Sequence, residues 1–355
     1  MLSVGKAHRN CTIWLRLLTR YKVDVLPSVS GVAVWFLAQI YAPLCGGVAL
    51  GVLLSALLGR CRLRSPQSHS WQHIVPSRLG KFLFWIGVPG SLIYFVRQTN
   101  LTGGVWLAPV MAWVTFSVAL TLAWGCLQLF ATKWPLPTKG AFLLLSMVGN
   151  TGYIGYPVVL LLPQLGINYF GWAVFYDLLG TVFAAYGLGA MIGAYYGRGS
   201  SQSRSLWQQS LDALLRSPTL PAFLLGLLLR AAPFPGWLDA GLRAFAWSTV
   251  MLSLVLMGMR LQQLRSWHQL RPALAATVIR MVITPIVVGL LLTLFGIVGA
   301  PRLVIVLQAA MPSAFATLVL AETFDLDRDL AVTCLGVSSA LLLLTLPLWL
   351  WGFPV

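Results

Sequence analysis

The sequence G-N-T-G-Y-I-G-Y-P occupies positions 149–157, in the middle of a long apolar stretch. Three glycines, an amide, a threonine and a proline stand there within nine residues. Proline removes a backbone donor and glycine does not favour a helix. Freed backbone groups are costly in hydrocarbon unless protein or water satisfies them. We therefore predict a broken transmembrane helix that lines a cavity, with a second half that begins near Pro157 and points its positive N-terminus into that cavity.

A second stretch, Q-A-A-M-P-S at positions 308–313, places another proline among small and polar residues inside an apolar span. Two broken helices that cross near the midplane would form a polar pocket suited to a carboxylate. The alternative is a pair of proline kinks with helix-packing glycines. The candidate substrate-binding residues are Asn150, Thr151, Gly152, Gln308 and Ser313, and the candidate crossover residues are Gly155, Pro157, Met311 and Pro312.

Asp177 and Arg280 are ionisable residues that lie well inside apolar spans, away from the span edges. Ionisable groups within a membrane are costly and are functional candidates by default, so both are candidates for ion or proton coupling. Asp177 could instead be a buried acid bonded to a neighbouring Tyr or Ser. Arg280 could pair with Asp177 or with a substrate, or snorkel toward the interface.

The composition indicates a membrane protein, because 58% of the 355 residues are apolar and only 9% are charged. Soluble domains carry roughly 25% charged residues. The net charge of +16 comes from short Lys and Arg clusters between apolar stretches, which is typical of membrane loops and not of a nucleic-acid-binding face. His69 and His73 stand four apart but have no third ligand nearby, so we expect no metal, no cofactor and no nucleic acid.

Ten apolar stretches are long enough to suggest membrane spans in an all-α protein. They lie near residues 43–58, 80–97, 105–130, 140–162, 168–196, 218–231, 238–259, 272–297, 301–321 and 329–352. The loops on one side hold 14 Lys and Arg and those on the other side four, which predicts a cytoplasmic first set and an external C-terminus in the plasma (inner) membrane. The basic N-terminal tail disagrees, so either it lies on the membrane or residues 29–42 add a crossing.

The spacing of Pro and Gly suggests an internal duplication. Pro43 precedes Gly51 by eight residues, as Pro218 precedes Gly226. We expect two inverted five-helix repeats, 29–196 and 218–355, with a basic segment at 1–28 and a cytoplasmic linker at 197–217. The alternative is that Pro and Gly are simply frequent in membrane helices.

The segment N-T-G-Y-I-G-Y-P at 150–157 resembles the N-T-x-x-x-G-x-P segment of the auxin efflux carrier family. Residues 307–350, with Q-A-A-M-P, V-L-A-E, D-x-D-R-D-L-A and T-L-P-L, resemble that family's last two spans. The resemblance covers about 140–185 and 301–350. It implies a ten-span inverted-repeat fold with a scaffold and a transport domain, whose fourth and ninth spans cross at their prolines. It also implies export of organic anions, with Asn150 on the substrate carboxylate.

This sequence departs from the family's pattern in two places. The seventh span has no Asn, so Ser248 or Thr249 would substitute, and the long cytoplasmic loop of the plant carriers is absent. Both departures argue against auxin as the substrate. We expect a secondary transporter, elevator-like and not an enzyme, for a small carboxylate. H+ is the candidate coupling ion and a homodimer the candidate assembly. The alternatives are a channel, a non-transporting binding protein or, less favoured, a membrane-embedded transferase.

Overall fold

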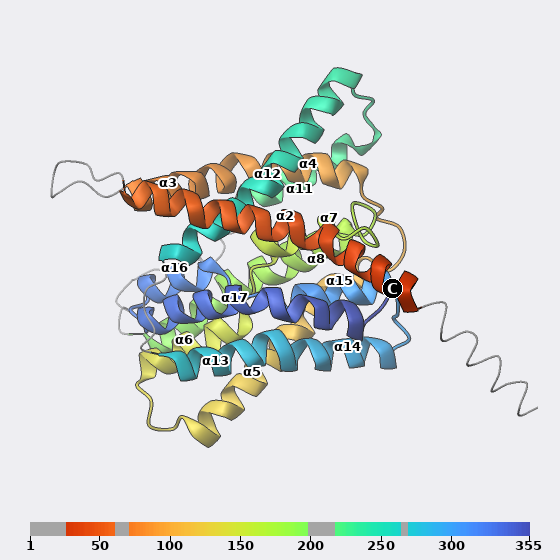
Figure 1. The fold of residues 1–355 in the computed structure, drawn as a ribbon. Helices are drawn as coiled ribbons and strands as arrows, with labels where there is room; N and C mark the ends of the chain where they lie inside the picture. Colours follow the sequence, from red (N-terminus) through yellow and green to blue (C-terminus); the bar gives the residue numbers. More distant parts are fainter. Residues whose placement is uncertain (1–25, 61–70, 198–216, 264–268) are drawn as a thin grey trace, which may run out of the picture. The chain divides into compact units, whose positions relative to one another are not determined.

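The computed structural model describes residues 26–60, 71–197, 217–263 and 269–355. Nearly all of the predicted basic segment 1–28, most of the predicted linker 197–217 and His69 lie outside these residues. The chain divides into two compact units, 1–46 and 47–355, and helix α2 (Leu26–Arg60) begins in the first and ends in the second. All contacts described below lie within the second unit (Figure 1).

The described residues are helical, with no strand among them and one isolated β-bridge. Among the described residues, seven helical stretches are long and apolar enough to cross a membrane, which confirms the predicted all-helical, multi-pass class. They are Tyr41–Gly59, Ile74–Gln98, Leu107–Phe130, Phe170–Tyr196, Gly236–Gln262, Leu270–Leu294 and Arg328–Gly352. Three shorter apolar helices, Thr151–Leu161, Thr219–Ala231 and Ala300–Ala309, lie in the remaining predicted stretches.

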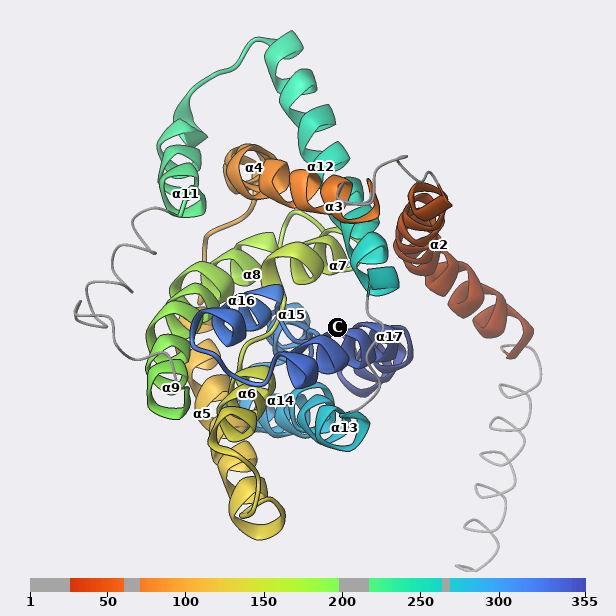
Figure 2. The same ribbon diagram turned by 90° about the vertical axis from the view of Figure 1, so that its left-hand side faces the viewer.

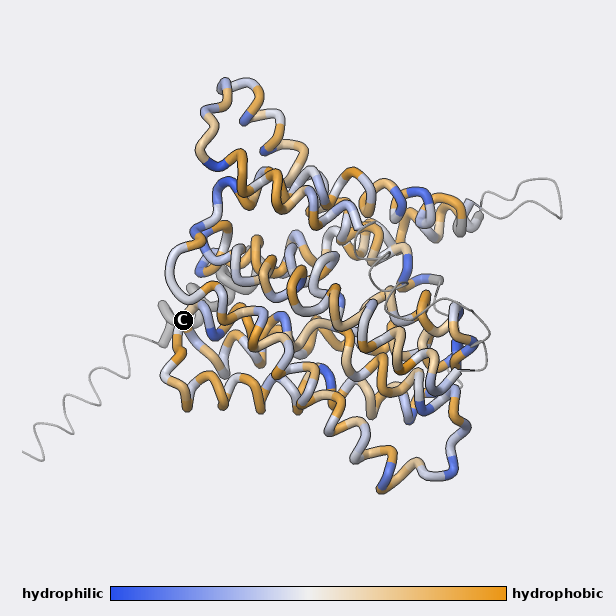
Figure 3. Tube along the Cα trace, turned by 180° about the vertical axis from the view of Figure 1, so that it is seen from behind, coloured by the Kyte–Doolittle hydropathy of each residue, from blue (hydrophilic) through white to orange (hydrophobic). Residues whose placement is uncertain are grey.

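Large apolar side chains face outward along the long helices. Trp124, Leu290 and Trp351 are 55%, 55% and 87% exposed. Figure 3 shows hydrophobic residues along the long helices and the most hydrophilic residues mainly near helix ends and connections. So much exposed apolar surface suits a hydrocarbon solvent and not water.

The helices form two groups, which Figure 2 shows most clearly. In the first, which we call the α4 group, α4 (Val88–Gln98) packs against α11 and α12, and α12 also contacts α3. The bounds of these partners are Trp71–Phe82 for α3, Thr219–Leu228 for α11 and Gly236–Gln263 for α12. The end of α2 joins this group through Gly51 and Gly258, whose backbones approach so closely that a Cβ on either would strike the other helix.

The second group, which we call the α6 group, surrounds α6 (Leu136–Met147) and α15 (Ala300–Ala309). Its other members are α5 (Leu107–Phe130), α7 (Tyr156–Leu161), α8 (Phe170–Tyr176), α9 (Gly189–Tyr196), α13 (Leu270–Val278), α14 (Thr284–Leu294), α16 (Phe315–Thr323) and α17 (Arg328–Gly352). Single π-helical turns connect α8 toward α9 at Asp177–Thr181 (η3) and Ala184–Leu188 (η4), and α13 to α14 at Ile279–Ile283 (η6). Such π-bulges occur often at functional sites.

The connections predicted for the cytoplasm contact one another. Asp327, the N-cap of α17, accepts hydrogen bonds at Oδ2 from the Thr138 hydroxyl and the Gln269 amide, both at 2.7 Å. Three loops that are distant in sequence therefore lie on one side of the second unit, as the charge pattern requires of loops on one membrane face.

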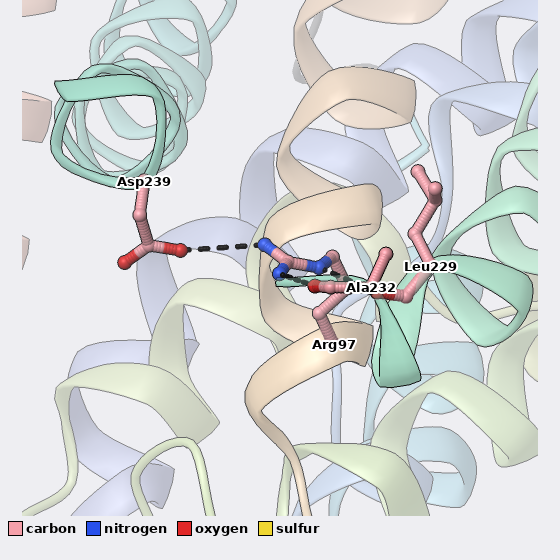
Figure 4. Close-up of polar contacts among 4 residues, drawn as sticks. All are labelled: Arg97, Leu229, Ala232 and Asp239. Atoms are coloured by element: carbon pink, nitrogen blue, oxygen red, sulfur yellow. Dashed lines mark hydrogen bonds and ion pairs between the residues drawn. The ribbon is translucent and has the colours of Figure 1, made fainter. Parts of the chain in front are cut away.

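The connections predicted for the opposite face also meet. At the end of α4, Arg97 Nε donates to the Leu229 carbonyl at 2.9 Å, Nη2 donates to the Ala232 carbonyl at 3.1 Å, and Nη1 pairs with Asp239 at 3.3 Å (Figure 4). The guanidinium also stacks on Phe234, at 3.5 Å from the ring centre. Arg97 thus links α4 to the connection between α11 and α12.

Arg230, just after the end of α11, makes a second link between the same two segments. Its Nη1 donates to the carbonyls of Val96 and Thr99, at 2.8 and 2.7 Å, where α4 ends. A cation at a helix C-terminus satisfies free carbonyls and complements the helix dipole. The Thr99 hydroxyl also accepts from the Gly171 amide at 2.9 Å. The loops after α4, before α8 and after α11 therefore share one face.

Candidate functional site

Two helices of the α6 group are interrupted, and the interruptions face each other. Helix α6 ends at Met147, and helical structure resumes at Thr151 with a π-helical turn, η2 (Thr151–Gly155), that leads into α7. Helix α15 ends at Ala309, and α16 begins at Phe315. The sequence predicted an interruption in each of these two apolar stretches.

The two interruptions are joined through their main chains. Gly149 and Ser313 form an antiparallel bridge. The main-chain N–H of Asn150 donates to the Pro312 carbonyl at 2.7 Å, and the main-chain N–H of Ala314 donates to the Val148 carbonyl at 3.0 Å. Backbone groups freed by each break thus satisfy those of the other, which removes a cost of several kcal/mol per group in an apolar medium.

Asn150 occupies the start of the resumed helix. Its side-chain oxygen accepts from the Tyr153 amide at 3.3 Å, which makes it the N-cap of η2. The residue is 4% exposed, and its Nδ2 has no hydrogen-bond partner within the described structure. A buried amide that has used its acceptor and kept two donors is suited to binding an anion.

A cavity of about 140 Å3 adjoins this N-cap. Its lining includes predicted residues Asn150, Thr151 and Gly152 together with Asp177. Further lining residues come from η1 (Leu83–Gly87), from α4, from the segment before α11 and from the start of α16. The cavity therefore lies where the α4 group meets the interrupted helices of the α6 group.

Asp177 is held by hydroxyl groups from the resumed helix. The Thr151 hydroxyl donates to Oδ1, and the Tyr156 hydroxyl donates to Oδ2 at 2.8 Å. Within the described residues no cation lies in ion-pair range of this carboxylate, and Arg280 bonds elsewhere. The predicted alternatives for Asp177 included a hydroxyl-bonded acid, and these are its bonds in the structure.

A larger cavity of about 390 Å3 shares Asn150 and Tyr153 with the first. Its described lining contains two cations, Lys81 and Arg260, and no acidic residue. The Arg260 guanidinium lies 5.4 Å from the ring centre of Phe315, the first residue of α16. Because Asn150 lines both cavities, the basic cavity also borders the N-cap of η2.

Gln308 and Ser313, both predicted to bind substrate, lie behind the junction and line neither of these cavities. The Ser313 hydroxyl donates to the Leu145 carbonyl at 2.8 Å. Gln308 is fully buried against Gly155, where a Cβ would overlap its amide, and the amide itself has no partner in the described structure. Both residues are therefore in contact with the opposite interrupted helix.

The predicted crossover prolines differ in setting. Met311 and Pro312 stand in the non-helical segment between α15 and α16. Pro157 lies in the first turn of α7, after the helix has already resumed at Thr151. The break thus precedes the position expected from Pro157, because an N-cap at Asn150 starts the helix and proline fits a first turn without strain.

Sequence reasoning did not single out Lys81 and Arg260, which it counted only as loop charges. Both stand at the edge of an apolar stretch, Lys81 near the start of 80–97 and Arg260 directly after 238–259. That position was the available signal, since a cation at a span edge can reach inward. Thr249, a candidate from the seventh span, lines a third, small cavity that shares Gly152 with the first.

This arrangement defines a class of protein: an integral, multi-pass helical membrane protein with a cavity, lined in part by polar side chains, at two interrupted helices. The sequence matches the family described as "Membrane transport protein" over residues 76–350, and the chain belongs to this transporter family, the auxin efflux carrier family. It is 30% identical over 217 residues to an uncharacterized transporter of Methanocaldococcus jannaschii, which covers 60% of this chain and 68% of that one. It is 27% identical over 279 residues to an uncharacterized transporter of Methanothermobacter thermautotrophicus, covering 77% and 87%.

Proposed function

We propose that this transporter is a secondary-active carrier for a small organic anion. The observation that carries the proposal is the buried side-chain amide of Asn150. Its Nδ2 has no protein partner in the described structure, and the residue lines both cavities. The N-terminus of η2 adds backbone donors and the positive end of a helix dipole on the same side. A carboxylate is the ligand that such donors fit best.

The charges of the larger cavity support the same substrate class. Lys81 and Arg260 line it without an acidic residue among its described lining, so its field attracts anions toward Asn150. The inner cavity, at about 140 Å3, is smaller than the roughly 300 Å3 at which pockets begin to hold drug-sized ligands. The proposed substrate is therefore a small acid.

We further propose that Asp177 carries a coupling proton. It lines the same cavity as Asn150 and accepts hydrogen bonds from the hydroxyls of Thr151 and Tyr156. An intramembrane acid without a counter-ion in the described structure can alternate between charged and neutral forms as the substrate moves.

The proposed mechanism is elevator-like alternating access, in which the α6 group moves against the α4 group. The cavities between the two groups and the main-chain bonds within the α6 group support this division. We propose the corresponding topology of ten spans in two inverted repeats, 29–196 and 218–355. In the plasma membrane the C-terminus would be outside, and Lys81 and Arg260 would then lie toward the cytoplasm.

A thermal-shift screen of the purified protein against small mono- and dicarboxylates tests the proposal. An acid that binds the folded state raises the melting temperature with concentration. The strongest binder is then used for flux into proteoliposomes, where a saturating rate favours a carrier over a channel. The mass of the detergent-solubilised protein tests the expected homodimer.

Asn150→Asp is the discriminating variant. Aspartate caps a helix as well as asparagine does, so folding should survive, but it replaces the free donor with a negative charge. We expect some fall in the melting temperature without ligand, because the new carboxylate is buried in the same cavity as Asp177, but a folded protein in which the carboxylate-induced shift is lost. An undiminished shift in Asn150→Asp would contradict the site.

A further inference from the structure

The guanidinium of Arg280 lies at the junction of the two interrupted helices. Arg280 extends from η6 and is fully buried. Its Nη1 donates to the carbonyl of Met147, the last residue of α6, and its Nε donates at 3.4 Å to the carbonyl of Met311, just after α15. The side chain therefore contacts both interruptions, each on the side where a helix ends.

Those ends are electronegative, because a helix C-terminus carries unpaired carbonyls and the negative end of the helix dipole. Two C-termini that meet inside a membrane attract a cation, and in many carriers half-helix C-termini hold the coupling ion. In the described structure no carboxylate pairs with Arg280, so the two helix ends and their carbonyls are what balance its charge.

The backbone of Gly149 is shaped to this guanidinium. A Cβ at residue 149 would overlap the Arg280 guanidinium, so only glycine leaves room for it there. The unpaired Nη2 atom of Arg280 is also enclosed, with no other described group bonded to it. The space between the two helix ends is thus occupied by a side chain of the protein.

We infer that Arg280 is a permanent cation that takes the place of a bound metal cation at the junction, so that this carrier requires no sodium ion. The inference deepens the proposed function, since it concerns the coupling ion of the same carrier. It depends on folding energetics at the junction and is tested without a substrate.

The first test uses the wild-type protein in detergent and follows Trp fluorescence during heating. Sodium, potassium and choline chloride are compared at equal ionic strength. We expect the same melting temperature in all three salts. A saturable stabilisation by sodium over both potassium and choline would overturn the inference, because it would reveal a separate sodium site.

The second test removes the charge. Arg280→Ala should lower the melting temperature by roughly 5 °C or more, because buried carbonyls lose their donors. Methylguanidinium chloride should recover most of this fall, whereas choline chloride should not. Arg280→Lys keeps the positive charge but loses the forked guanidinium group. Its melting temperature should lie between those of the wild type and Arg280→Ala. A melting temperature of Arg280→Ala equal to that of the wild type would overturn the inference.

Arg230→Ala is the matched control. Arg230 also donates to main-chain carbonyls at a helix end, but it lies outside this junction and is exposed. Methylguanidinium should not restore the melting temperature of Arg230→Ala. Equal recovery of both variants would show that methylguanidinium does not act at the Arg280 site, and would overturn the inference. If Arg280→Ala fails to fold, the sodium comparison on the wild type and the Arg280→Lys measurement still decide. A failure to find any carboxylate ligand would count against the proposed function and leave these results unchanged.

Discussion

The Arg280 guanidinium and the Gly149 backbone are in such close contact that a methyl group on residue 149 would overlap the guanidinium. This contact joins the eighth predicted span to the fourth. It brings a positive charge next to Gly149, which directly precedes Asn150, the N-cap of the resumed helix.

Gly149→Ala should therefore destabilise the protein strongly in the wild type and much less in an Arg280→Ala background. Overpacking of this kind costs about 1–3 kcal/mol, and we expect most of that cost to disappear once the guanidinium is gone. The four melting temperatures of the double-mutant cycle measure the coupling. Gly125→Ala is the control, since nothing lies near a Cβ at that position. Additive effects of the two junction substitutions would contradict the contact.

Asp177→Asn should abolish the dependence of flux on a pH gradient while leaving the folded protein intact. The asparagine oxygen can accept from one of the two hydroxyls, of Thr151 or Tyr156, and its NH2 group can donate to the oxygen of the other, but the side chain carries no proton across. The measurement is carboxylate uptake into proteoliposomes with and without an inward proton gradient. Asp239→Asn, which alters an acid in the first turn of α12, should keep the dependence. Persistent stimulation by the gradient in Asp177→Asn would remove this residue from the coupling role.

Reversing the charge at Lys81 or Arg260 should slow the capture of carboxylates. Charges that line a cavity steer ligands, so Lys81→Glu should lower the association rate by about tenfold or more at low salt, and by less as salt is added. The rate is measured by stopped-flow Trp fluorescence. Lys133→Glu makes the same change on an exposed connection and should have little effect. An equal effect of both variants would indicate net charge and not the cavity.

The Arg97 contacts should matter more for stability than its ion pair does. Arg97→Ala removes two hydrogen bonds to main-chain carbonyls and a stacking contact, so we expect a loss of about 2–4 kcal/mol. Asp239 is 38% exposed, so Asp239→Asn should cost less than about 1 kcal/mol. Unfolding of the two variants compares them directly. Equal losses would mean that the carboxylate, and not the carbonyls, holds Arg97.

Much of the fold could be predicted because membrane segments are recognised by local composition. The apolar stretches coincide with helices, and the G-N-T-G and Q-A-A-M-P-S segments each fall at an interruption. Those segments signal a break through their own chemistry, since glycine, proline and small polar residues do not sustain a helix. The side chains of Asn150 and Thr151 face a cavity, as expected for the residues that start the second half-helix.

The rest depended on contacts between distant segments. Pro157 suggested a break at the proline, yet the Asn150 cap starts the helix earlier, and a proline is silent in a first turn. Arg280 and Asp177 were a plausible pair by charge, but each has its own partners. Gln308 was a reasonable ligand by type and instead packs on Gly155. The periodicity of a sequence does not predict which distant residues will be in contact.

The bonds from Asn150 to Pro312 and from Ala314 to Val148 are made by main-chain atoms alone. Substitution of side chains leaves these main-chain donors and acceptors in place. The residues that line the cavity can therefore change during evolution while the two interrupted helices stay bonded to each other. A proline at residue 150 or 314 would remove one of the two main-chain donors and so break one of these hydrogen bonds. Displacement of one interrupted helix alone would therefore stretch or break these two main-chain hydrogen bonds.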